Sequence, residues 1–121
     1  MKKIFFLIVL LFSMPMFLQA VNTQILYSKI DSLLPFAQIT FSKSLLNKYN
    51  YEQAPGGMQN KFLEKRLKAI ETLKGILAYA ESLELTLEAQ RRALQNDYIA
   101  LKRNVYSAKN SVRSMIQIAQ E

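Results

Sequence analysis

The sequence predicts an all-α protein built as a long helical hairpin or coiled coil. Apolar residues recur at helical spacing through most of the chain, and a single Pro-Gly-Gly loop divides it into two arms. No segment after residue 20 alternates apolar and polar residues as a strand does. An alternative within the same class is a three-helix bundle, in which the second arm breaks near Asn96 and Asp97 and folds back.

Residues 1–20, MKKIFFLIVLLFSMPMFLQA, have the layout of a secretory signal peptide. Two lysines precede an uninterrupted apolar run over residues 4–12, and Ala20 is the small residue expected before a cut at Val21. The apolar stretch contains Pro15 and is shorter than the roughly 20 residues that a membrane-spanning helix requires. We therefore expect an exported bacterial protein that lies in the periplasm, at the cell surface or outside the cell. Retention as an inner-membrane anchor is the less favoured alternative.

The expected mature chain, residues 21–121, is a single basic domain. The full chain carries 16 Lys and Arg against 9 Asp and Glu, for a net charge of +7, and it contains no histidine and no cysteine. The usual zinc, copper, haem and iron–sulfur sites therefore lack their ligands, and a Ser-His or Cys-His nucleophile cannot form. Gly56 and Gly57 are not part of a phosphate-binding loop, because its other glycines and its lysine are absent. The sequence predicts that the protein is not an enzyme and has no catalytic residue, metal or cofactor.

The mature chain divides into two helical arms. The first arm is expected over about residues 23–49 as one helix kinked at Pro35, because the apolar positions keep the same phase on both sides of the proline. Residues 50–58 form the loop, and the second arm is expected over about residues 59–120. The apolar positions of the first arm are Leu26, Ile30, Leu33, Ala37, Phe41 and Leu45.

The second arm carries a seam of mostly apolar positions separated by alternating steps of three and four residues. This 3.5-residue period is typical of a left-handed coiled coil, and it runs from Ile70 to Ala119 without a slip. The seam positions expected to pack are Ile70, Leu73, Leu77, Leu87, Leu94, Tyr98, Leu101, Val105, Val112 and Met115.

The length of the second arm raises the question of what covers the seam. An unbroken helix over residues 59–120 would be about 90 Å long, against about 40 Å for the first arm. Either the second arm breaks near Asn96 and Asp97 and folds back, or the uncovered half of the seam is buried against another chain. Because no Gly or Pro lies at that point and the apolar phase is continuous, the sequence favours the unbroken helix and self-association.

Two charged residues, Glu84 and Arg91, interrupt the apolar seam. A staggered or antiparallel partner chain would bring Glu84 of one helix beside Arg91 of another, and such a pair would fix register and oligomeric state. The other interpretation is that both side chains reach water from a shallow part of the seam. The carboxylates of Glu81 and Glu88 share a helix face with that of Glu84. Because arginines follow within reach, we interpret this cluster as a salt-bridged surface and not as a metal site.

Basic residues are concentrated in the C-terminal part of the second arm. They form a candidate contact surface for an anionic lipid, a cell-wall polymer or an acidic protein. Cations near a helix C-terminus are also stabilised by the helix dipole, and this ordinary explanation stays open. The residues of this C-terminal basic surface are Arg92, Lys102, Arg103, Lys109 and Arg113.

These features favour a non-catalytic structural or interaction protein of the bacterial cell envelope. It would associate with itself or with a component of a secretion, pilus or surface assembly. A protein is thus the expected partner and an anionic envelope surface is a second candidate, whereas nucleic acid is not expected for an exported chain. Two alternatives remain: a basic periplasmic chaperone or adaptor, and a membrane-anchored coiled-coil spacer if residues 1–20 are retained.

Overall fold

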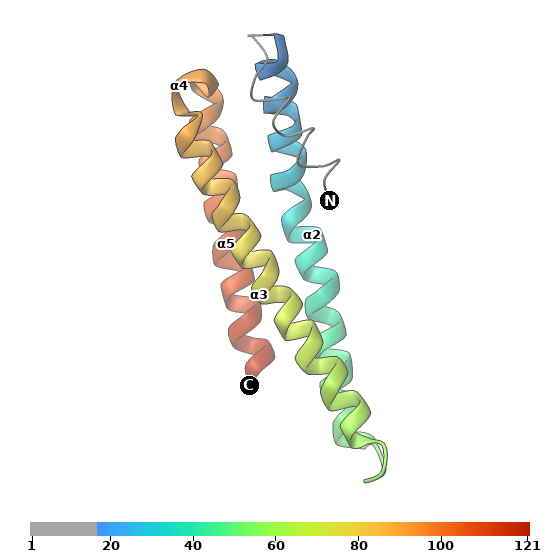
Figure 1. Cartoon of the computed structure of the whole chain (residues 1–121). Helices are drawn as coiled ribbons and strands as arrows, with labels where there is room; N and C mark the ends of the chain where they lie inside the picture. The colour runs from blue at the N-terminus through green and yellow to red at the C-terminus, as the bar shows by residue number, and fades with distance from the viewer. Residues whose placement is uncertain (1–16) are drawn as a thin grey trace.

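The computed structural model describes the backbone of residues 17–121, and the side chains from residue 23 onward. The helices are α2 (Phe17–Gln53), α3 (Gln59–Ala89), the short α4 (Arg91–Leu94) and α5 (Asn96–Gln120), and the described residues contain no strand. The three long helices pack against one another in pairs and form a three-helix bundle (Figure 1). The predicted all-α class is confirmed, in its three-helix form.

The predicted signal peptide falls mostly outside the described residues. Helix α2 begins at Phe17 and continues through Ala20 and Val21, so the predicted cleavage point lies within this helix in the uncut chain. Among residues 17–121, no helix combines the length and the apolar character needed to cross a membrane.

Helix α2 is one continuous helix that includes Pro35, as the constant apolar phase predicts. Leu26, Ile30, Leu33 and Ala37 are buried on its inner face, and Phe41 is partly buried. Leu45, the last predicted apolar position, is exposed instead.

Farther along α2, hydroxyl side chains take the inward positions. Thr40 and Ser44 are buried there, and each donates a hydrogen bond to a carbonyl of its own helix, at 3.0 Å to Phe36 and 2.7 Å to Phe41. These local bonds satisfy the buried hydroxyls, so α2 needs no polar partner from α3 at this height.

The predicted Pro-Gly-Gly turn joins α2 to α3. Helix α2 runs to Gln53 and α3 starts at Gln59, so the connection is shorter than the predicted loop over residues 50–58. The backbone amide of Met58 donates to the carbonyl of Pro55 at 2.9 Å, which closes a tight turn across the two glycines.

The unbroken helix favoured for residues 59–120 is wrong, because the chain reverses between α3 and α5. The reversal is centred on Gln95, the only non-glycine residue of the described chain at positive φ (φ 51°, ψ −118°). The amide of Leu94 still donates to the carbonyl of Gln90 at 2.9 Å, and that of Tyr98 to the carbonyl of Gln95 at 3.2 Å. Backbone strain at one residue costs about 1–3 kcal/mol. Burying even two leucine side chains offsets that, at about 1.5–3 kcal/mol each.

The fold-back places both halves of the seam in one core within the chain. Leu77 and Met115 of the seam are partly buried against this core. The buried seam positions are Ile70, Leu73, Leu87, Leu94, Tyr98, Leu101, Val105 and Val112, and the alanines that continue the same steps of three and four, Ala80, Ala108 and Ala119, are buried with them. The seam is therefore real, but α2 and the opposite half of the seam cover it, and a second chain is not needed to do so.

Helix α5 is shorter than the hairpin against which it packs. Its C-terminal end lies beside Arg66, whose Nη2 donates to the carbonyl of Ala119 at 2.8 Å. Beyond that point α2 and α3 continue as a pair toward their connecting turn (Figure 1). We refer to this two-helix end, residues 47–65, as the hairpin tip.

Candidate interaction surface

Polar contacts tie α5 to the other two helices near the reversal. Tyr27 on α2 donates its hydroxyl to Oδ1 of Asp97 at 3.0 Å, and burial together with this carboxylate raises the pKa of Tyr27. Glu88 on α3 accepts hydrogen bonds from the Tyr98 hydroxyl and from the Lys102 ammonium. The bond from Lys102 is the main reason why the pKa of Glu88 lies below its ordinary value. These contacts fix the angle at which α5 returns, and we assign them a structural role.

The two charges within the seam do not pair with each other in this chain. Glu84 lies 3.1 Å from the ammonium of Lys109 on α5, where Lys109 is itself buried. The guanidinium of Arg91 lies over the ring of Tyr98, at 5.1 Å from its centroid. The register pair of Glu84 and Arg91 thus has no counterpart inside the bundle.

The C-terminal basic surface is only partly available to a partner. Lys109 is occupied by Glu84 and Lys102 by Glu88. Arg103 directly follows Lys102, so it points about 100° away around α5. Arg92 is exposed on α4, and Arg113 lies within 3.5 Å of Asn110 on its own helix. The five basic residues therefore do not form one surface: two are in ion pairs within the bundle, and the others lie on different faces.

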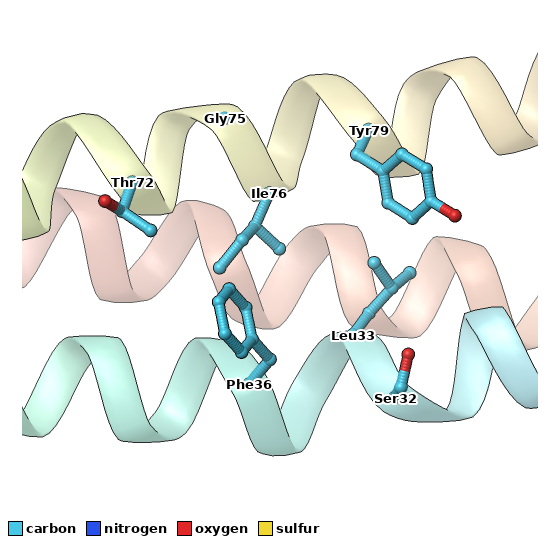
Figure 2. Close-up of a pocket in the computed structure, with 7 residues that line it drawn as sticks. All are labelled: Ser32, Leu33, Phe36, Thr72, Gly75, Ile76 and Tyr79. Atoms are coloured by element: carbon cyan, nitrogen blue, oxygen red, sulfur yellow. The ribbon is translucent and has the colours of Figure 1, made fainter. Parts of the chain in front are cut away.

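A groove lies between α2 and α3, on the side away from α5. Its first part has a volume of about 520 Å³, and Figure 2 shows Phe36 of α2 and Ile76 of α3 pointing toward each other in it, with α5 behind. Phe36 and Tyr79 stay 55% and 44% exposed there. This part is lined by Ser32, Leu33, Phe36, Thr72, Gly75, Ile76 and Tyr79.

A second depression, of about 320 Å³, continues the first toward the hairpin tip. The two share Phe36 and Thr72, and we call them together the α2–α3 groove. Ile39, at the edge of the second part, is 57% exposed. The second part is lined by Phe36, Ile39, Thr40, Lys43, Asn47, Lys65, Lys68, Ala69 and Thr72.

The chemistry of the α2–α3 groove is apolar and cationic. The hydroxyls of Ser32 and Thr72 donate to carbonyls of their own helices, at 2.8 Å and 2.9 Å, so their hydrogen bonds are satisfied within α2 and α3. Three lysines, Lys43, Lys65 and Lys68, line the second part, and no Asp or Glu is among the described residues that line either part. The groove can hold an apolar surface that carries negative charge.

No residue of this groove stands out as a site in the sequence. Phe36, Ile39 and Lys43 follow one another at steps of three and four on α2, but this stripe runs beside the core positions and looks like their continuation. The sequence feature that could have indicated the groove is the width of the apolar face of the first arm, which exceeds the width that packing against one helix requires.

Carboxylates do not gather into a metal site in the part of the chain that the structure describes. No group of three or more Asp, Glu, His or Cys residues is close enough there to hold an ion.

Comparisons with known protein families, curated proteins and solved structures find no match for this chain.

Proposed function

We propose that this chain is an exported, non-catalytic interaction protein of the bacterial cell envelope, which binds a protein partner through the α2–α3 groove. The observation that carries the proposal is the groove itself. Phe36, Ile39 and Tyr79 stay exposed in a groove that lysines also line, although the apolar core of the bundle is buried. Exposed apolar side chains gathered in a depression with a charged rim are typical of a binding site.

The seam is buried inside the bundle, so its length does not require self-association. The proposal therefore favours a component of an envelope assembly over a self-associating coiled coil. Export rests on residues 1–20 alone.

Export is tested by mass spectrometry of the N-terminus of the protein purified from its native host. We expect the chain to begin at Val21. A chain that retains Met1 would favour the membrane-anchored spacer instead.

Partner binding is tested by placing a photoreactive phenylalanine analogue at position 36 and irradiating intact cells. We expect a discrete cross-linked adduct. The matched control is position 106 on α5, where Tyr106 is 61% exposed but does not line the groove. The proposal fails if position 36 yields no adduct, or if both positions yield the same ones.

The hairpin tip favours a second candidate, the basic chaperone or adaptor. Tyr49 and Met58 are exposed at the tip, near lysines, where they would contact unfolded chains. Suppression of the aggregation of an unfolded outer-membrane protein, lost when both residues are changed to serine, would support this candidate. An unchanged aggregation rate in the presence of the protein would exclude it.

A further inference from the structure

We infer that the α2–α3 groove holds an acidic amphipathic helix of another protein, packed as a fourth helix on the α2–α3 pair. This inference rests on the proposed function and identifies the chemistry of the partner. Three features support it: the shape of the groove, the glycine in its wall and the sign of its charge.

The shape of the groove matches a helix. Its lining runs along α2 from Ser32 to Asn47, which corresponds to about 22 Å of helix axis. Helices α2 and α3 are neighbours over this length, and α5 covers only their opposite side. A helix of about 15 residues fills such a depression between two helices by ridges-into-grooves packing, as in a four-helix bundle.

Gly75 lies in the wall of the groove, and no contact within this chain explains why the residue is a glycine. A Cβ atom at Gly75 would meet no atom within 4 Å, and no glycine of the described chain has positive φ. Neither internal packing nor backbone conformation therefore requires glycine there. A glycine within a helix costs about 1 kcal/mol relative to alanine. Its use is explained if the backbone of a partner helix approaches α3 closely at this point.

The charge of the groove selects an acidic partner. Lys43, Lys65 and Lys68 line it without any carboxylate. A second copy packed groove to groove would bring the same lining and would leave all these ammonium groups without a counter-ion. Both copies would also carry a net positive charge, with or without Lys2 and Lys3. Glutamates flanking the apolar stripe of a partner helix would supply the missing charge.

A lipid surface fits the groove less well than a helix does. Proteins that lie on membranes present an apolar helix face that sinks into the lipid. Here Leu33 and Ile76 are buried at the bottom of a depression, below the exposed rings of Phe36 and Tyr79.

The test measures binding of the purified protein to two labelled synthetic helices by fluorescence anisotropy. Both peptides carry leucines at steps of three and four; the first has glutamates on its flanks and the second has lysines at the same positions. We expect the acidic peptide to bind at least about tenfold more tightly, and its binding to weaken with salt. Equal binding of the two peptides, or no binding of the acidic one, would overturn the inference.

Gly75→Leu provides the sharpest variant, because it fills the groove without disturbing the fold. The new side chain starts in open space. We expect an unchanged or higher melting temperature together with a loss of acidic-peptide affinity of about tenfold or more. The matched control is Ser114→Leu, at an exposed position of α5, which should bind as the unaltered protein does. Wild-type affinity in Gly75→Leu would contradict the inference.

Two further measurements test the alternative occupants of the groove, a membrane and a second copy of this chain. Vesicles of phosphatidylglycerol and phosphatidylcholine that bind the protein, but not Phe36→Ala, would assign the groove to a membrane. A dimer in sedimentation that Phe36→Ala dissociates would assign it to a second copy. If the acidic peptide fails while cross-linking at position 36 still captures a protein in cells, only the acidic-helix inference falls and the proposed function stands.

Discussion

The ion pair between Glu84 and Lys109 links α3 to α5, and its removal has an effect that can be worked from the geometry. The Lys109 ammonium lies 3.1 Å from Oε1 of Glu84, with the lysine side chain 10% exposed and that of the glutamate 28%. Glu84→Leu leaves a nearly buried cation without a counter-ion. Breaking a fully buried pair costs about 3–5 kcal/mol. Because this pair retains some contact with water, we expect a cost of about 2 kcal/mol, scaled down from that range. For a domain of this size, that lowers the melting temperature by roughly 10 °C.

The two partners of this pair are expected to respond unequally. Lys109→Met leaves the more exposed Glu84 behind, which water can solvate, so this variant should lose only about 1 kcal/mol. In the double variant Glu84→Leu/Lys109→Met no charge is stranded, and its stability should return close to that of the unaltered protein.

Urea denaturation followed by far-UV circular dichroism measures all four proteins of this cycle, and urea is preferable because it does not screen charges. The matched control is Lys74→Met, which breaks an exposed 3.8 Å pair with Glu71 and should cost less than about 0.5 kcal/mol. The reasoning is refuted if Glu84→Leu is as harmless as this control, or if the double variant loses as much as the two single variants together.

Three other substitutions probe the reversal and the ends of the bundle. Gln95→Gly should stabilise the protein by about 1 kcal/mol in urea denaturation, because glycine adopts the positive φ of that residue without strain; a loss of stability would contradict a strained turn. Arg66→Met should lower the stability by about 1 kcal/mol through the lost bond to the Ala119 carbonyl, and an unchanged urea midpoint would show that this bond contributes nothing. Glu88→Gln should reduce the melting temperature near neutral pH. This difference should shrink as the pH falls below 4.5, the ordinary pKa of the carboxyl, because a lowered pKa in the folded protein stabilises it only while Glu88 is ionised; a difference that persists in acid would refute the assignment.

The sequence predicted which residues form the core, but it ranked the fold-back that builds this core below an unbroken helix. A heptad seam requires only that its residues share one face, and that holds equally for a long helix and for two antiparallel helices. The reversal at Gln95 carries no glycine or proline, and no side-chain cap starts α5; Asp97 accepts a bond from Tyr27 instead. The turn forms because the intramolecular core requires it. Asn96 and Asp97 indicated a possible break at this point, but no side chain caps the start of α5.

The candidate site was less predictable than the core. Phe36 and Tyr79 belong to apolar stripes whose centres are buried, and only the packing of α5 on the opposite side leaves their flanks open. The C-terminal basic surface shows the reverse effect: Lys102 and Lys109 looked available until the fold-back placed them beside glutamates. In both cases the partner of a side chain depends on the direction in which α5 returns.

The short length of α5 has a consequence for the dynamics of the hairpin tip. Beyond Arg66 each helix is held by a single neighbour, whereas α5 packs on both helices over most of their remaining length. Local opening of residues 47–65 therefore exposes less apolar surface than opening of the bundle, and it needs less free energy than global unfolding. Backbone amides at the tip should exchange with deuterium well before those near Leu73 and Leu101. A partner that reaches from the α2–α3 groove onto the tip would slow this exchange, and the slowed amides would identify the residues that it covers.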